Sequence, residues 1–287
     1  MKDEEFMLPM PGGGELAVIV DRPQGAPVGR VILVPPFGMN SERMFPVSYL
    51  LVQNGFEVFR FDPRSAPGGH SSGAMVDYTM SGLVDDIHVV IDRVPDAILV
   101  AISLSARSVT RALAHRDDWH AAVLLTPVVN SHFTVDQAIG WSVFGVRLAG
   151  EALPPDLQIL GVPIRSTCID DILQHDLHDV PHAIADLSRC ARPVTLIAGD
   201  ADPWVKIDEV RETVDGARRA GRPVTLVTVE AASHQLYRNP VLALKYFQTA
   251  AQECLRVVGR SVERAVAAPF SEIVSAAESV RLRERVQ

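Results

Sequence analysis

The stretch "AILVAISLSARSVTRALAHR" (residues 97–116) decides the fold, because it joins an apolar run directly to a segment with helix-forming composition. The run 97–102 carries no charged residue, which is typical of a strand buried on both faces of a parallel sheet. We expect the helix to begin near Ala106. The stretch therefore predicts a strand, a sharp turn that carries two serines, and a helix.

Other short apolar runs alternate with longer segments of helical period along most of the chain. This alternation predicts an α/β fold with a mostly parallel central sheet flanked by helices. The expected strands are "LAVIV" (16–20), "RVILV" (30–34), "EVFRF" (57–61), "AILVAI" (97–102), "AAVLL" (121–125), "PVTLIA" (193–198) and "PVTLVTV" (223–229).

The alternation stops between residues 127 and 188. A loop of that length without secondary structure is unusual in a compact domain, so we expect an inserted helical cap. The predicted domain organisation is therefore a core of residues 1–126 and 189–287, with a cap of residues 127–188.

Composition narrows the possible functions. The formal net charge of −8 argues against nucleic-acid binding, which needs a basic surface. The acidic N-terminus has no apolar signal region, and no apolar run is long enough to span a bilayer, so we expect a cytoplasmic protein with no membrane span. The three cysteines show no paired spacing and predict neither disulfides nor zinc ligands. The sequence makes no prediction of oligomeric state.

The second serine of the turn, Ser105, is the candidate nucleophile. A reactive serine on a strand-to-helix turn usually lies in a small-x-Ser-x-small motif, because the tight turn crowds both flanking positions. Ser103 satisfies the first of these positions, whereas Arg107 departs from the pattern at the second. The alternative interpretation is that Ser105 only caps the following helix.

The partners of a catalytic serine follow in the order acid and then histidine, each after a predicted strand. Asp200 and Asp202 lie in "GDADPWV" (199–205), and His234 lies in "EAASHQLY" (230–237). Asp202 is preferred because it lies further into the loop, although spacing alone leaves Asp200 open. Taken singly, each residue has an ordinary alternative role, as a turn or helix cap for Asp202 and as a backbone-bonded loop residue for His234.

An oxyanion hole needs two backbone N–H groups that point to the developing negative charge. One is expected from Ala106, the residue after Ser105, and the other from the loop "PPFGMN" (35–40). Pro35 and Pro36 have no N–H, so Phe37 is the first possible donor in that loop.

Five stretches carry a resemblance to a known family: "SLSAR" (103–107), "HSSGAMVDYTMS" (70–81), "PVVNSHFTVDQAIGW" (127–141), "DADPWVKIDEV" (200–210) and "ASHQLYRNPVLALKYFQ" (232–248). They resemble the acyl-transferases of bacterial bioluminescence, serine thioesterases that release long fatty acyl groups from acyl carrier protein. The resemblance implies an α/β-hydrolase fold with a cap, and a nucleophile at the second serine of "SLSAR". It implies that Ser105, Asp202 and His234 are the catalytic residues. It also implies that Arg107 belongs to the family's version of the serine motif.

The predicted function is transfer of an acyl group from an acyl thioester, of carrier protein or coenzyme A, to Ser105 and then to water or a small acceptor. This chemistry belongs to fatty-acid or polyketide metabolism and needs no cofactor and no metal. Two alternatives stay open, namely a carboxylester hydrolase and a non-catalytic acyl-binding protein. Residues that could receive an acidic carrier protein, or alternatively form ordinary surface ion pairs, are Arg43, Arg64, Arg107 and Lys206. A metal site in the cap among Cys168, His175, His178 and His182 is not predicted, because their spacing matches no common ligand pattern.

Overall fold

The computed structural model describes residues 4–234, 236, 239–269 and 271–276. Its main sheet contains β1 (Glu4–Pro9), β2 (Glu15–Asp21), β3 (Gly29–Val34), β4 (Phe56–Phe61), β5 (Ile98–Ile102), β6 (Ala121–Leu125), β9 (Val194–Gly199) and β10 (Val224–Val229). Their order is β1-β2-β4-β3-β5-β6-β9-β10. The two pairs that involve β2 are antiparallel and the other pairs are parallel. The predicted, mostly parallel sheet is confirmed.

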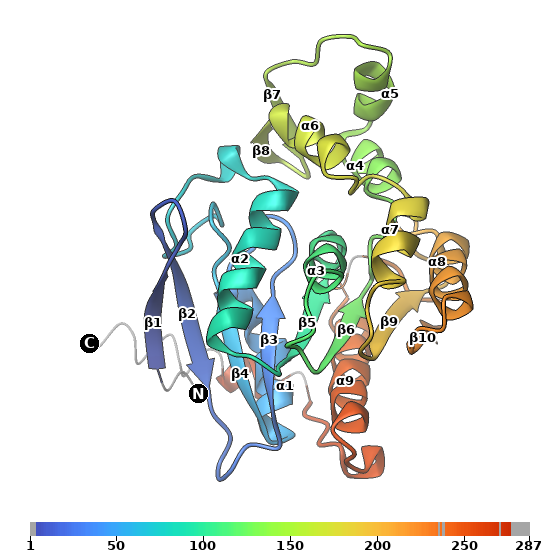
Figure 1. Cartoon of the computed structure of the whole chain (residues 1–287). Coiled ribbons are helices and arrows are strands. Elements are labelled where there is room, and N and C mark those ends of the chain that lie inside the picture. Colours follow the sequence, from blue (N-terminus) through green and yellow to red (C-terminus); the bar gives the residue numbers. More distant parts are fainter. Residues whose placement is uncertain (1–3, 235, 237–238, 270, 277–287) are drawn as a thin grey trace.

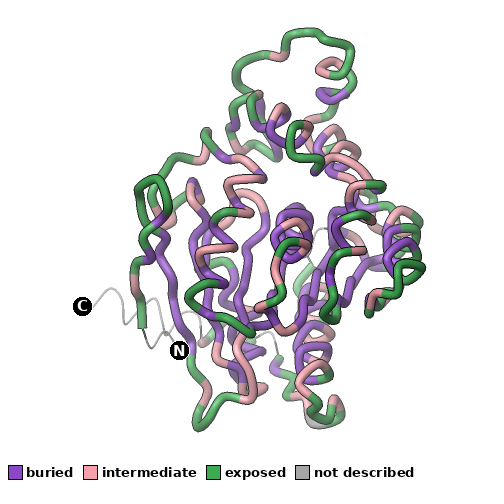
Figure 2. Tube along the Cα trace, in the orientation of Figure 1, coloured by how far each residue is buried: buried purple, intermediate pink, exposed green. Residues whose placement is uncertain are grey.

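Helices cover both faces of this sheet (Figure 1). One face packs against α2 (Met80–Arg93), α3 (Ser105–Leu113), α7 (Val180–Leu187) and α8 (Ile207–Arg219), and the other against α1 (Phe45–Gln53) and α9 (Pro240–Val257). The central strands are therefore buried on both sides, as Figure 2 shows. This explains why they are continuous apolar runs rather than alternating ones. No helix in the described part of the chain is both long and apolar enough to cross a bilayer.

Side chains at the helix starts explain where several helices begin. Thr79 accepts a hydrogen bond from the N–H of Gly82 at the start of α2. Asn239 does the same for Leu242 at the start of α9. Such caps satisfy N–H groups that have no partner inside the helix.

The segment between β6 and β9 contains α4 (Ser131–Ile139), α5 (Val143–Leu148), β7 (Asp156–Ile159), β8 (Val162–Arg165) and α6 (Thr167–Gln174), and then α7. Most of it stands above the carboxyl ends of the parallel strands (Figure 1). The antiparallel pair β7–β8 was not foreseen in a helical cap. Helix α7 packs with α3 and α8 over the sheet, so it is part of the layer that covers the core. The boundaries 127–188 of the cap stay a prediction.

Arg107 holds α3 against α7. Its Nη1 donates to Asp186 Oδ2 at 2.5 Å and its Nη2 donates to the carbonyl oxygen of Asp176 at 2.8 Å. The Arg107 side chain is 0% exposed. Arg107 therefore lies inside the protein, which corrects the suggestion that it could face an acidic partner at the surface.

We expect Asp186→Ala to lower the free energy of unfolding by about 3–5 kcal/mol, because it leaves the Arg107 guanidinium buried without its carboxylate. Urea denaturation followed by circular dichroism measures this loss. The double variant Arg107→Met, Asp186→Leu should recover much of it, since it removes both charges together. A double variant no more stable than Asp186→Ala would contradict this explanation.

Candidate active site

The turn between β5 and α3 is centred on Ser103. The strand ends at Ile102 and the helix begins at Ser105. Ser103 has a φ of 61°, in the left-handed region that non-glycine residues seldom adopt. Such a strained turn holds a serine hydroxyl out from the backbone at the carboxyl edge of the sheet. Ala101 and Ser105 are then the two small flanking residues of the motif.

Ser103 is the first member of a chain of hydrogen bonds. Its Oγ lies 2.7 Å from Nε2 of His234, and Nδ1 of His234 lies 2.8 Å from Oδ2 of Asp202. The side chains of His234 and Asp202 are 7% and 1% exposed. A carboxylate at Nδ1 favours the tautomer in which Nε2 accepts the serine proton. The arrangement can therefore activate the Ser103 hydroxyl as a nucleophile.

The loop after β9 holds the acid in place. Asp202 Oδ1 accepts the N–H groups of Trp204 at 2.8 Å and Val205 at 3.0 Å. Asp200 instead accepts the N–H of Ala231 at 2.7 Å and so ties this loop to the loop that carries His234. Of the two acidic residues considered from the sequence, the structure brings Asp202 to the histidine.

Ser105 does not contact His234, which corrects the pairing predicted from the sequence. The strand ends so that the tight turn falls on Ser103, and Ser105 is the first residue of α3. The Ser105 side chain is buried, and its Oγ donates to the carbonyl oxygen of Pro35 at 2.6 Å. Ser105 therefore anchors the loop after β3 to the start of α3.

The predicted oxyanion donor Ala106 is not free to act, because the turn is centred on Ser103 rather than on Ser105. The Ala106 N–H donates to the carbonyl oxygen of Ser103 at 3.1 Å, inside the turn. The residue after Ser103 is Leu104, and within the described residues neither its N–H nor that of Phe37 has a hydrogen-bond partner. The N-terminus of α3 adds a positive potential at this end of the helix. Leu104 and Phe37 are therefore the backbone donors that the structure leaves free for an oxyanion.

Gly199, the last residue of β9, lies against the loop that carries His234. A Cβ at this position would lie 2.1 Å from the carbonyl oxygen of Ala232 and 2.7 Å from the Tyr246 hydroxyl oxygen. That carbonyl also accepts the N–H of Ala201 at 3.2 Å. Only glycine allows β9 to approach the histidine loop this closely.

We expect Gly199→Ala to push the His234 loop away from Asp202 and to destabilise the protein by about 1–3 kcal/mol. Thermal unfolding measures the stability, and turnover of a short-chain aryl ester measures the site. Gly221→Ala is the control, because a Cβ there meets no atom within 4 Å, although its φ of 75° adds local strain. Equal losses of activity in the two variants would contradict the steric explanation.

The cap reaches the acid loop through α4. Thr134 Oγ1 donates to the carbonyl oxygen of Trp204 at 2.7 Å, and the Trp204 ring lies 5.2 Å from that of His234. Lys206 Nζ lies 3.8 Å above the Phe133 ring and 3.3 Å from Glu209. The Lys206 charge is therefore already paired.

Arg64, on the loop after β4, is paired as well. Its backbone N–H and its Nε both donate to the Asp86 carboxylate, at 2.7 and 2.5 Å. Burial raises the pKa of Asp86 to about 6, although Arg64 opposes this shift. Of the basic residues suggested for carrier binding, Arg43 is exposed and has no ion pair within the described residues.

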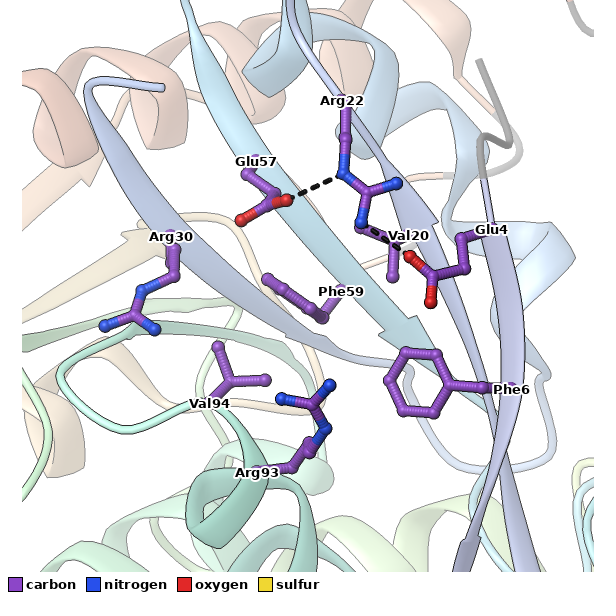
Figure 3. Close-up of a pocket in the computed structure, with 9 residues that line it drawn as sticks. All are labelled: Glu4, Phe6, Val20, Arg22, Arg30, Glu57, Phe59, Arg93 and Val94. Carbon is purple, nitrogen blue, oxygen red and sulfur yellow. Dashed lines mark hydrogen bonds and ion pairs between the residues drawn. The ribbon is translucent and has the colours of Figure 1, made fainter. Parts of the chain in front are cut away.

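A cavity of about 210 Å³ lies at the amino end of β3 and β4, at the opposite end of the sheet from Ser103 (Figure 3). Figure 3 shows Arg30 and Arg93 beside apolar side chains and Glu57 paired with Arg22. None of the residues in the Ser103–His234–Asp202 chain lines it. It is therefore separate from the candidate active site.

The sheet order, with helices on both faces and a tight turn after β5, defines the α/β-hydrolase fold. Solved structures share this fold at 19% identity. One is Est1E from Butyrivibrio proteoclasticus with ferulic acid bound, which matches over 89% of this chain and 100% of that chain with a TM-score of 0.70. Another is a monoacylglycerol lipase from Paleococcus ferrophilus, which matches over 85% and 99% with a TM-score of 0.64.

The chain belongs to the acyl transferase family, whose model matches residues 30–284. An acyl transferase from Vibrio campbellii is 25% identical over 268 residues, which cover 90% of this chain and 85% of the relative. One from Aliivibrio fischeri is 25% identical over 230 residues, which cover 78% and 73%. These relatives confirm the family resemblance seen in the sequence. Family and fold together support acyl transfer or acyl hydrolysis.

Proposed function

We propose that this protein is a serine acyltransferase or thioesterase that carries the acyl group on Ser103. The observation that carries the proposal is the unbroken hydrogen-bond chain from Ser103 Oγ through His234 to Asp202. The acyl transferase family supports acyl transfer. The resemblance of five stretches of the sequence to the thioesterases of bacterial bioluminescence supports an acyl thioester as donor. A cytoplasmic site of action stays part of this proposal.

In the first half-reaction, Ser103 Oγ attacks the thioester carbonyl while His234 Nε2 takes its proton. The negative charge of Asp202 stabilises the imidazolium that forms. The carbon–sulfur bond then breaks, and His234 gives the proton to the leaving thiolate. The products of this step are a free thiol and an acyl ester on Ser103.

The oxyanion formed during this attack needs two aligned donors. We assign them to the N–H groups of Leu104 and Phe37, in place of Ala106 and Phe37. The hydrogen bond from Ser105 to Pro35 fixes the loop that carries Phe37, two residues further on. Ser105 is therefore a positioning residue.

In the second half-reaction, water or a small alcohol or amine attacks the acyl ester. His234 removes a proton from the acceptor and returns it to Ser103 Oγ, which releases the acyl product. A carrier protein or coenzyme A is the proposed source of the acyl thioester. No metal or cofactor takes part in either half-reaction.

The variants Ser103→Ala and Ser105→Ala separate the two serines. We expect Ser103→Ala to form no acyl adduct and to lower kcat by at least about 10⁴-fold, because it removes the nucleophile. Ser105→Ala should still form the adduct, with kcat lower by roughly 10-fold, because the Phe37 donor loses its anchor. The measurement is intact-protein mass spectrometry after brief incubation with acyl-pantetheine, acyl-CoA and acyl-carrier-protein thioesters.

An adduct that persists in Ser103→Ala and disappears in Ser105→Ala would overturn the assignment of the nucleophile. An adduct from simple esters but not from any thioester would instead identify a carboxylester hydrolase. If the wild-type protein forms no adduct with thioesters or with simple esters, it would be an acyl-binding protein.

The variants Asp202→Asn and Asp200→Asn test the acid. Asp202→Asn should lower kcat by about 10³–10⁴-fold, because an amide does not hold the same His234 tautomer or stabilise its charge. Asp200→Asn should keep kcat close to the wild-type value, since an amide oxygen still accepts the Ala231 N–H. Steady-state kinetics on the preferred thioester measures both variants. Equal losses in the two would contradict the assignment of Asp202.

A further inference from the structure

The link between α6 and α7 carries a cluster of possible metal ligands. One ligand atom from each of Asp176, His178 and His182 lies within 4.8 Å of the others. The sequence did not predict this group, because the spacing of the cysteine and the histidines matches no common ligand pattern and Asp176 was not considered with them. The structure also leaves out two candidates, since Cys168 is buried in α6 and His175 pairs with Asp171.

A single carboxylate contacts both imidazoles of this cluster. Asp179 Oδ1 lies 2.7 Å from Nδ1 of His182, and Asp179 Oδ2 lies 3.2 Å from Nε2 of His178. A histidine that donates one N–H to a carboxylate presents the lone pair of its other nitrogen. This leaves the lone pair of His182 Nε2 for a ligand, whereas His178 contacts Asp179 as an ion pair without hydrogen-bond geometry.

The remaining nitrogens of the two imidazoles differ in their surroundings. His178 Nδ1 is buried and has no hydrogen-bond partner within the described residues, an arrangement that costs free energy in a folded protein. His182 Nε2 lies 3.4 Å from Oδ1 of Asp176. The three side chains lie close enough together for one ion to bind all of them.

We propose that Asp176, His178 and His182 bind one divalent transition-metal ion of the zinc type, with solvent in the remaining coordination position. Two imidazoles and one carboxylate suit zinc, whereas magnesium and calcium prefer oxygen ligands. Asp179 orients His182 by a hydrogen bond and also contacts His178. The ion takes no part in the chemistry at Ser103.

The position of the cluster indicates what the ion does. The carbonyl oxygen of Asp176 accepts hydrogen bonds from Arg107 and Arg111 of α3. The carbonyl oxygen of His178 accepts the N–H of His132 in α4 at 2.9 Å. The ion therefore clamps the segment through which the cap returns to the core.

Isothermal titration calorimetry of the tag-free full-length chain, stripped with a chelator and titrated with zinc chloride, tests the proposal. We expect one zinc ion per chain with a micromolar or tighter Kd, and loss of this binding in His178→Ala and in His182→Ala. His175→Ala is the matched control and should bind as the wild type does, because its imidazole contacts Asp171 outside the cluster.

Asp179→Asn separates ligand orientation from folding. Asparagine caps a helix as well as aspartate does, so α7 should keep its start, while zinc binding weakens by about 10-fold or more. Zinc should raise the Tm of the wild type and of His175→Ala, and leave the Tm of His178→Ala and His182→Ala unchanged. Absence of zinc binding to the wild type, or equal loss in His175→Ala and His178→Ala, would overturn the proposal. The cluster would then be a set of surface ion pairs only.

Discussion

The left-handed backbone at Ser103 is the constraint on which the candidate site depends. It reverses the chain between β5 and α3 within two residues, so that the Ser103 hydroxyl meets His234 while the start of α3 lies under it. The same reversal turns Ser105 inward to the carbonyl of Pro35. The conformation of Ser103 thus places the proposed nucleophile and the unpaired N–H of Leu104. It also places Ser105, which anchors the loop that carries Phe37.

The sheet was predictable because strands buried on both faces are continuous apolar runs, and each of the seven expected runs matches a strand to within one residue at either end. The edge strand β1 was not predicted. Its sequence begins with two glutamates, and it pairs with β2 alone, in antiparallel register. The structure pairs His234 with Ser103 rather than with the predicted Ser105. The strand ends at Ile102 as predicted, but apolar periodicity does not show which of the two serines after it takes the tight turn.

Asp202 and His234 were accessible from the sequence because each follows a strand of the sheet, and parallel strands bring their carboxyl ends to one edge. The close approach at Gly199 could not be predicted from the sequence, because it depends on how two loops pack against each other. The pairing of His178 and His182 with Asp176 depends likewise on a single left-handed residue, Asp176, in the link before α7. Apolar runs therefore predict where the strands lie, whereas contacts between loops depend on backbone angles and packing.

The bond from Thr134 to the Trp204 carbonyl ties α4 of the cap to the acid loop. Trp204 lies against His234, so a movement of α4 away from the core would disturb the acid loop and the base together. Within the described residues, α5 and the β7–β8 pair form no hydrogen bond with the acid loop. That half of the cap can therefore change in sequence without moving the acid loop, whereas a change in α4 reaches the loop directly.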